Sequence, residues 1–459
     1  MKITQVIENV FKKYLPSPFT IAILLTFITI LLALVFTKPV DVSIGNYSLE
    51  VLRFWENGIW SNGLLVFAYQ MMLILVLGHV LVLSKPVSSL ILRVTKYCTN
   101  TANSAVIVSV TTMLVSFFNW GLGLIFGALL ARKVGEHAQR ENIKLNYPII
   151  GAAGYVGLMV WHGGISGSAP IKINEEGHIK SIMSSVSSEE TLAKIPSLID
   201  YSQTVFSWWN LLIFVLVLLT VSVTFYFLGR KAKPTNLNLP EYIMEDKEKS
   251  TTQAEKLDNS KVLSIIFGVL ILVAFFYQYS DDVLALKITP NLINFFMFGL
   301  GILLHGSFKK FTNAVGESIS DVSGILIQFP LYFGIMGIMK SAGMVTLISD
   351  FFVSVSTATT LPIFTFFSAG LVNIFVPSGG GQWVVQGPIV VESALQLGVP
   401  LPKAIMALAY GDQITNMLQP FWALPLLGIT KLKAKEILPY TLIAMVVGSA
   451  VYLLGLLVF

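Results

Sequence analysis

Four glycine- or proline-broken motifs interrupt long apolar stretches of this chain, two in each half. The first half carries Asn119 to Gly123 and Trp161 to Ser168, and the second carries Pro377 to Trp383 and Asp412 to Pro420. Irregular backbone is tolerated at membrane depth only where protein buries it or where it lines a cavity. Matching interruptions in two halves of a membrane chain therefore predict a transporter with its binding site between the halves.

The composition supports a membrane location for these stretches. Of the 459 residues, 54% are hydrophobic and only 12% are charged, about half the ~25% charged residues of a soluble protein. Several apolar runs reach the ~20 residues that a helix needs to cross a bilayer. Basic residues gather in short loops, as the positive-inside rule requires, so the net charge of +5 does not indicate a nucleic-acid partner. We expect an all-α polytopic membrane protein.

The order of apolar segments predicts nine crossings and two re-entrant hairpins, with the N-terminus cytoplasmic and the C-terminus outside. Segment 104–131 has basic residues on both flanks, and the ~15 residues before its break are too few to span at ~1.5 Å each. The alternative is one long span with a glycine-rich packing face. We expect crossings at 18–36, 62–84, 148–170, 205–228, 262–279, 290–304, 313–339, 402–428 and 437–458, a second hairpin at 361–398, and an interfacial piece at 343–358.

The polar stretch between the halves suggests the domain organisation. We expect a first membrane repeat at 1–229, a flexible cytoplasmic linker at 230–260, and a second membrane repeat at 261–459. The first hairpin enters from inside and the second from outside. The prediction is two inverted-topology repeats, each with a re-entrant hairpin and a broken transmembrane helix, and a site near the midplane.

The hairpin tips are suited to binding a small anion. Free backbone N–H groups and a helix dipole attract a carboxylate, and glycine lets a ligand approach the backbone closely. Close helix packing is the alternative explanation for each single glycine. No Gly-Lys-Ser/Thr follows the triple glycine, so it is not a phosphate loop, and the energy is expected to come from an ion gradient. The candidate substrate-binding residues are Asn119, Trp120, Gly121, Gly123, His162, Ser166, Ser168, Ser378, Gly379, Gly380, Gly381 and Gln382.

Asp412 is the sharpest single candidate, because the apolar run 402–428 holds no other acid. An acid inside a membrane is by default a cation ligand or a proton carrier; the alternative is an edge residue hydrogen-bonded to Gln413 or Asn416. His162 is either a proton relay or a plain hydrogen-bonded histidine. Both Na⁺ and H⁺ remain open as the coupling ion, and no other cofactor is expected. The candidate cation-coupling residues are Asn119, Asn373, Asp412, Asn416 and Gln419.

Aromatic residues flank the four breaks and suit an apolar wall for a short acyl chain, although an interfacial aromatic belt explains any one of them equally well. They are Trp120, Trp161, Trp383, Phe421 and Trp422.

Over its whole length the chain resembles the short-chain fatty acid uptake family, within the ion transporter superfamily. The residues that carry the resemblance are 119–123, 163–170, 377–388 and 410–425. It implies a permease of the bacterial inner membrane that imports short monocarboxylates, such as acetoacetate or butyrate, by cation symport with an elevator-like movement. The chain departs from the family pattern at His162, where glycine is usual, at Gln382, where histidine is common, and at Asp412, where glutamate is common.

Two other functions compete with this one. A di- or tricarboxylate carrier would require a second subsite with a cationic or N–H-rich lining. The predicted core offers no Arg or Lys, which favours a monocarboxylate. A membrane-embedded hydrolase would need a nucleophile beside a base. The one cluster of this kind is His162, Ser166 and Ser168, and its motif Gly-Ile-Ser-Gly-Ser lacks a paired acid. The expected partners are a small monocarboxylate and the lipid bilayer, and a homodimer remains open.

Overall fold

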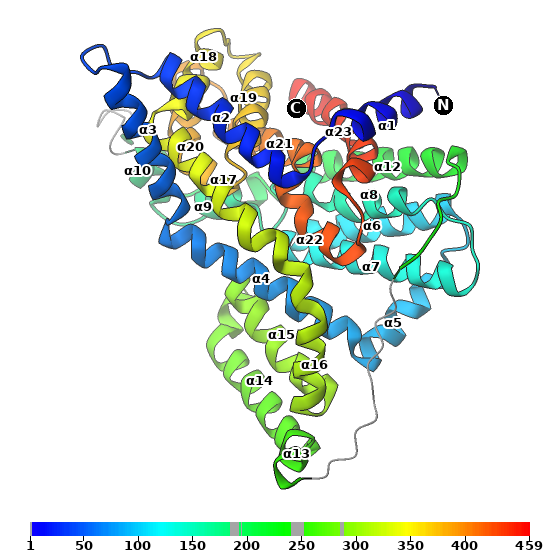
Figure 1. Ribbon diagram of the computed structural model, residues 1–459. Coiled ribbons are helices and arrows are strands. Elements are labelled where there is room, and N and C mark those ends of the chain that lie inside the picture. The colour runs from blue at the N-terminus through cyan, green and yellow to red at the C-terminus, as the bar shows by residue number, and fades with distance from the viewer. Residues whose placement is uncertain (1, 184–191, 194, 240–251, 285–288) are drawn as a thin grey trace.

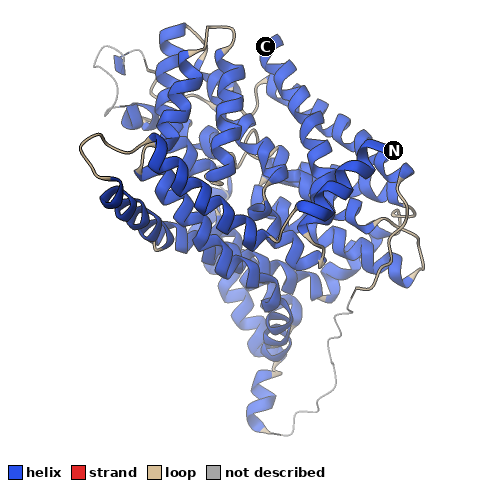
Figure 2. Cartoon of the chain, turned by 45° about the horizontal axis from the view of Figure 1, so that its top comes forward, coloured by secondary structure: helices blue, strands red, loops and turns tan. Residues whose placement is uncertain are grey.

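The computed structural model describes residues 2–183, 192–193, 195–239, 252–284 and 289–459. Within these ranges every regular element is a helix (Figure 2). The first half contains α1 Lys2–Tyr14, α2 Pro18–Phe36, α3 Ile44–Ile59, α4 Asn62–Leu83, α5 Lys85–Thr95, α6 Thr101–Phe118, α7 Trp120–Arg140, α8 Tyr147–Tyr155, η1 Val156–Met159, α9 Ser168–Ile173, α10 His178–Met183, η2 Tyr201–Gln203 and α12 Trp208–Lys231.

The second half is equally helical. It contains α13 Gln253–Asp258, α14 Lys261–Leu284, α15 Pro290–His305, α16 Phe308–Ser318, η3 Ile319–Val322, α17 Ser323–Ser341, α18 Met344–Ser354, α19 Leu361–Phe375, α20 Gly379–Leu397, α21 Leu401–Thr415, η4 Asn416–Leu418, α22 Pro420–Thr430 and α23 Ala434–Val458. In Figure 1, α13 to α16 project below the rest of the molecule, and α1 packs against α23 near the two termini.

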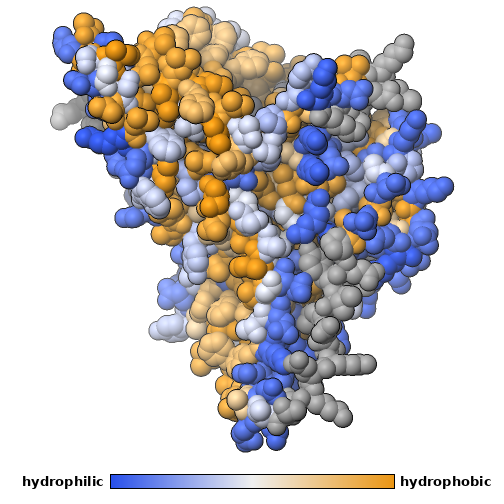
Figure 3. All heavy atoms as spheres, viewed as in Figure 1, coloured by the Kyte–Doolittle hydropathy of each residue, from blue (hydrophilic) through white to orange (hydrophobic). Residues whose placement is uncertain are grey.

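Seven helices of the described residues are long and apolar enough to cross a bilayer: α2, α4, α6, α12, α14, α17 and α23. Helix α14 exposes Val262, Ile266 and Val273 by about 60% each, a surface suited to lipid. Figure 3 shows hydrophobic side chains gathered over the upper part of this face and continuing toward its lower end, with hydrophilic ones at the right edge and the lower tip. The prediction of an all-α polytopic membrane protein is confirmed.

The first predicted break divides α6 from α7 and has a local cause. Asn119 takes an extended conformation and its side-chain oxygen accepts a hydrogen bond from Leu122 N at 3.0 Å, which caps α7. The two helices form a packed pair, hairpin 1. The first arm has 18 residues rather than about 15 and is long enough to cross by itself, so the length argument for a re-entrant hairpin was wrong.

The second predicted break is built in the same way. The Ser378 side chain accepts from Gly381 N at 3.1 Å and caps α20, while α19 ends at Phe375. Helices α19 and α20 pack together as hairpin 2. Local capping residues in the sequence therefore account for both tips.

Each hairpin lies beside a broken helix. Helix α8 passes into η1 and then into irregular backbone at 160–167 before α9, and α21 passes through η4 into α22. The two breaks meet, because the Tyr155 hydroxyl donates to the carbonyls of Asn416 at 2.8 Å and Gln419 at 3.1 Å. The predicted order of hairpin and broken helix in each half is present. The inverted relation between the halves stays a prediction.

Two expected segments differ in the structure. Residues 37–61, which lie between the expected crossings at 18–36 and 62–84, contain α3. This helix packs on α17 and buries Tyr47, Val51 and Gly58, while Arg53 and Glu56 stay exposed. Its charged residues lie on the outer side of an amphipathic helix. The span expected at 313–339 is divided into α16, η3 and α17.

The expected linker falls partly outside the described residues. Its first part is docked on the first half: Asn146 Nδ2 donates to the Lys233 carbonyl, and Leu239 N donates to Gln139 Oε1, both at 2.8 Å. These bonds hold 233–239 against α7 and α8.

Candidate functional site

A histidine and an aspartate from opposite halves of the chain meet at the centre of the structure. His162 Nδ1 is in hydrogen-bond contact with Asp412 Oδ2, and the two side chains are 0% and 1% exposed. Ala169 N donates to His162 Nε2 at 3.1 Å, so Nε2 is the acceptor and the ring proton lies on Nδ1, toward the carboxylate. The second carboxylate oxygen, Asp412 Oδ1, has no partner among the described residues. The His162–Asp412 pair therefore consists of one buried hydrogen bond beside one carboxylate oxygen that has no partner in that part of the chain.

The second half also fixes the irregular backbone around His162. Gln413 Oε1 accepts hydrogen bonds from His162 N at 2.7 Å and from Gly163 N at 3.1 Å. Asn210 Nδ2 donates to the Gly163 carbonyl at 3.0 Å, and the Tyr410 hydroxyl donates to Asn210 Oδ1 at 2.6 Å. These bonds satisfy backbone groups that the broken helix leaves without helical partners.

The predicted cation-coupling residues divide into two places. Asn373 Nδ2 donates to the Asp412 carbonyl at 2.6 Å and to Asn416 Oδ1 at 2.8 Å, and Gln419 Nε2 donates to the Asn373 carbonyl. These four residues therefore form one network behind the His162–Asp412 pair. Asn119 lies at the tip of hairpin 1, where it caps α7.

The tip of hairpin 2 rests on the His162–Asp412 pair. A Cβ placed on Gly379 would lie 2.7 Å from the Trp161 ring and 2.9 Å from His162 Cε1. A Cβ on Gly380 would meet only Ser168, at 3.8 Å. The absence of a side chain at Gly379 is what allows this approach.

The tip of hairpin 1 is bound to the same irregular segment from the other side. Trp120 N donates to Ser166 Oγ at 2.9 Å, and Ile165 N donates to the Phe117 carbonyl at 2.8 Å. A Cβ on Gly123 would overlap Ser116, so this glycine serves close packing of the two arms. A Cβ on Gly121 would meet atoms only at 3.5 Å or more.

Four of the five expected aromatic residues gather beside the tips. Trp120 lies 5.9 Å from Trp161 and 5.3 Å from Trp422 between ring centroids, and Phe421 adjoins Trp422 at 5.0 Å. Trp383 lies elsewhere, with its indole N–H donating to His178 Nε2 at 3.1 Å.

Two further aromatic rings complete this wall and were not predicted. Phe67 of α4 lies 6.2 Å from Trp120, and Phe329 of α17 lies 4.0 Å from Phe421. Both stand in apolar helices without a motif, so no local signal distinguished them.

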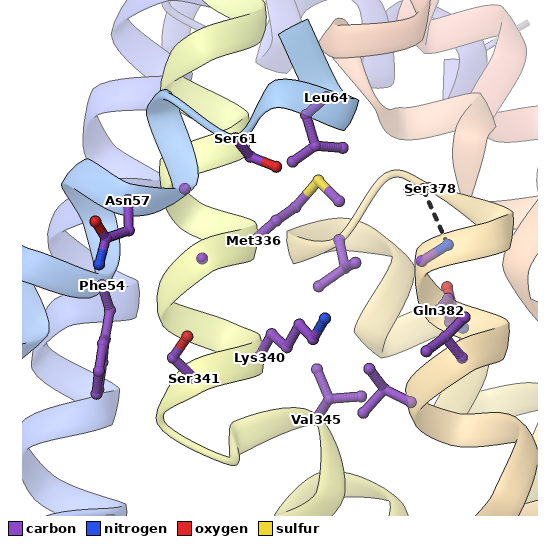
Figure 4. A pocket seen from close by; sticks show the side chains of 16 residues that line it. Phe54, Asn57, Ser61, Leu64, Met336, Lys340, Ser341, Val345, Ser378 and Gln382 are labelled. Carbon is purple, nitrogen blue, oxygen red and sulfur yellow. Dashed lines mark hydrogen bonds between the residues drawn. The ribbon is translucent and has the colours of Figure 1, made fainter. Parts of the chain in front are cut away.

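A cavity of about 380 Å³ separates the tip of hairpin 2 from α3, the start of α4 and α17 (Figure 4). Its lining includes Ser378, Gly381 and Gln382 from hairpin 2, and Lys340 from the end of α17. Lys340 was missed because it falls one residue beyond the expected span at 313–339. Its side chain is exposed and extends toward hairpin 2.

The sequence pattern of a family described as short chain fatty acid transporter matches residues 1–459. The chain is 35% identical over 474 aligned positions to an Escherichia coli K12 protein provisionally named a short-chain fatty acid transporter, covering 100% of this chain and 99% of that one. This chain belongs to the short-chain fatty acid transporter family. A Haemophilus influenzae protein with the same provisional name is 33% identical, with 99% of each chain covered.

Solved structures show weaker likeness. The YdaH transporter of Alcanivorax borkumensis aligns over 96% of this chain and 98% of its own, with 12% identity and a TM-score of 0.43. MtrF of Neisseria gonorrhoeae, described among antimetabolite efflux pumps, aligns over 98% and 96%, with 14% identity and a TM-score of 0.43.

As a member of a transporter family, the protein is a membrane-embedded transporter and not an enzyme. The statement that His162 lacks a paired acid was wrong, because Asp412 pairs with it from 250 residues away. His162 Nε2 is nevertheless occupied by Ala169 N and does not serve as a base for Ser166 or Ser168.

Proposed function

We propose that this transporter imports short monocarboxylates, each with one proton, across the bacterial inner membrane, with its N-terminus in the cytoplasm. The observation that carries the proposal is the buried His162–Asp412 pair, formed where the broken helices of both halves meet. The two hairpins and the broken helices would move together, elevator-like, against α3, α4 and α17. The hairpins pack on the broken helices through close glycine contacts, which supports their moving as one body.

The bonding of the pair favours a proton as the coupling ion. Nε2 of His162 already accepts a backbone hydrogen bond, so a second ring proton would break that bond. The next proton goes to Asp412 Oδ1, which has no partner in the described part of the chain. Binding of this proton neutralises a charge held away from water, where an ion is costly. The pair thus alternates between one and two protons without rearranging its backbone.

A monocarboxylate fits the charge balance. One anionic carboxylate and one proton cross together without net charge, so the membrane potential does not oppose import. The cavity beside hairpin 2 has one cationic side chain, Lys340, and apolar walls that include Leu64, Met336 and Val376. A di- or tricarboxylate would leave further charges unpaired there.

Sodium coupling is the second candidate, through the oxygens of Asn373, Asn416 and Gln419. Asn416 Oδ1 and the carbonyls of all three residues already accept hydrogen bonds, whereas Gln419 Oε1 has no partner among the described residues. A sodium ion held by the oxygens that already accept hydrogen bonds would displace those bonds, each worth about 0.5–1.5 kcal/mol, whereas a proton on Asp412 Oδ1 displaces none.

The experiment measures net butyrate uptake into vesicles that hold the purified protein. Labelled butyrate is offered under a pH gradient, a sodium gradient or a potassium diffusion potential, with empty vesicles to correct for leak of the neutral acid. We expect saturable uptake whose rate depends on the pH gradient and does not depend on the membrane potential. Uptake that follows sodium alone would refute proton coupling, and strong competition by succinate would refute the monocarboxylate class.

Asp412→Asn tests the pair itself. The amide oxygen still accepts from His162 Nδ1, so the fold is preserved, but the side chain no longer takes up a proton. We expect net uptake under a pH gradient to be lost while exchange of labelled for unlabelled butyrate continues. The control is Glu392→Gln on α20, a partly buried acid that bonds Gln396, and it should keep both activities. Equal loss of net uptake and exchange would refute the proton-carrier role.

A further inference from the structure

The cavity between hairpin 2 and α17 has the size and lining of a small-molecule site. Its volume of about 380 Å³ falls in the ~300–1,000 Å³ range of ligand pockets. Apolar side chains line both sides of the cavity, and the capping turn of α20 lies on the side of hairpin 2. The apolar residues are Phe54, Leu64, Met336 and Val345 on one side, and Val376, Val384 and Val385 from hairpin 2.

The wall formed by α3 and α17 is built from backbone. A Cβ on Gly58 would overlap the Phe333 carbonyl, and a Cβ on Gly337 would overlap the Phe54 carbonyl. On Gly334 it would lie 2.5 Å from the Trp55 ring. Helices joined this closely through small residues move as one body, so the position of Lys340 at the end of α17 is fixed relative to α3.

Among the described residues that line the cavity, Lys340 carries the one charged side chain, and this residue is exposed. Figure 4 shows it reaching from α17 across the cavity, with its ammonium directed toward the side lined by Gln382. Within the described residues its ammonium makes no ion pair or hydrogen bond. An exposed cation that reaches into a cavity, with no carboxylate partner among the described residues, is free to pair with an anionic ligand.

We infer that Lys340 binds the substrate carboxylate in this cavity and selects anionic over neutral ligands. The inference rests on the proposed function, and it names the group that recognises the charge. The acyl chain lies among the apolar side chains of the cavity, which include Met336 and Val376, and the carboxylate lies between the Lys340 ammonium and the turn at Ser378.

The same turn of hairpin 2 separates this carboxylate from the His162–Asp412 pair. Ser378 and Gly381 line the cavity, while Gly379 rests on Trp161 and His162. A substrate that draws the turn toward Lys340 therefore also moves the residue that covers the pair. Substrate and proton sites are coupled through a single turn of backbone.

The transport test uses Lys340→Gln and Lys340→Arg. A charge-assisted hydrogen bond is worth enough that its loss raises KM for butyrate about tenfold to a hundredfold, with a smaller change in kcat. Lys340→Arg should recover most of the affinity. Inhibition by butyramide, the neutral analogue, should be the same in wild type and Lys340→Gln, so the discrimination between carboxylate and amide collapses only in the glutamine variant.

The matched control is Lys403→Gln. Lys403 lines a different hollow, of about 410 Å³, together with Trp208 and Phe459, and its loss should leave KM for butyrate unchanged. An unchanged KM in Lys340→Gln, or an equal rise in Lys403→Gln, would overturn the inference.

A binding measurement separates failure of this inference from failure of the proposed function. The purified protein is treated with an amine-reactive reagent, and modification of each lysine is followed by mass spectrometry. Butyrate should protect Lys340 severalfold and leave Lys403 unprotected, while butyramide protects neither. Saturable wild-type uptake without protection of Lys340 would overturn the inference alone. Protection without uptake in any gradient would uphold the site and refute the coupled carrier.

Discussion

The contact between hairpin 2 and the His162–Asp412 pair predicts that one methyl group at Gly379 strongly slows transport. The Cβ of Gly379→Ala would lie 2.7 Å from the Trp161 ring and 2.9 Å from His162 Cε1, closer than the ~3.5–4.0 Å of an optimal contact. Trp161 is 5% exposed and His162 is fully buried. Neither ring has room to retreat, so the hairpin tip must move instead.

The size of the effect follows from this crowding. Forcing one extra methyl into a well-packed site costs about 1–3 kcal/mol. This free-energy cost destabilises the closed arrangement, in which the tip of hairpin 2 rests on the His162–Asp412 pair. The cost is absent when the tip moves away from the pair. Since 1.4 kcal/mol is a factor of ten, the population of the closed arrangement should fall roughly 5- to 150-fold.

The neighbouring glycine supplies a matched control for this variant. In Gly380→Ala the new Cβ would meet only Ser168, at 3.8 Å, an ordinary contact. Both glycines lie in the first turn of α20 and neither has a positive φ, so alanine suits the backbone at both. The assay compares butyrate exchange in vesicles and thermal unfolding in detergent for the two variants.

We expect Gly379→Ala to lose exchange by at least about fivefold while its unfolding midpoint stays close to that of the wild type. Gly380→Ala should keep both. If the two variants transport equally well, the tip does not need to seat against the His162–Asp412 pair. If Gly379→Ala simply unfolds, the methyl group disrupts the fold rather than one arrangement of the hairpin.

Two further predictions concern stability. Gly58→Ala should lower the unfolding midpoint in detergent, at a cost of about 1–3 kcal/mol, because its Cβ meets the Phe333 carbonyl, whereas Gly45→Ala on the same helix meets nothing within 4 Å and should not. Burial lowers the pKa of His178 below the usual histidine value, and the Trp383 indole donates to its unprotonated Nε2. That stabilisation is complete above pH ~6.5 and declines as pH falls through the lowered pKa. His178→Gln should therefore flatten the fall of the unfolding midpoint in acid, and identical acid profiles would disprove this role.

The elements that the sequence predicted well have local causes. The side chain of Asn119 caps α7 in hairpin 1, and the side chain of Ser378 caps α20 in hairpin 2. Such caps can be recognised from a few consecutive residues. The breaks after α8 and α21 likewise follow from glycine and proline in the chain. Helix α3 was missed because its alternation of charged and apolar residues resembles a polar loop until a partner helix buries one face.

The sequence predicted only part of the candidate site, because the contacts that form it are long-range. Asp412 stood out as an isolated acid, and His162 as a polar residue in a glycine-rich break, but nothing in the chain indicated that they touch. Lys340 resembled an ordinary basic residue at the end of a span. Its place in a cavity depends on α17 being set against α3 and opposite hairpin 2.

By itself, the sequence determined the class of protein, the apolar spans and the points at which helices break, because hydropathy, capping and glycine act over neighbouring residues. Only the tertiary structure decided that His162 meets Asp412, that Gly379 covers them, and that Lys340 faces the same turn. These contacts join residues up to 250 positions apart. They arise from how whole helices pack, and packing is a property of the assembled set of surfaces rather than of any one segment.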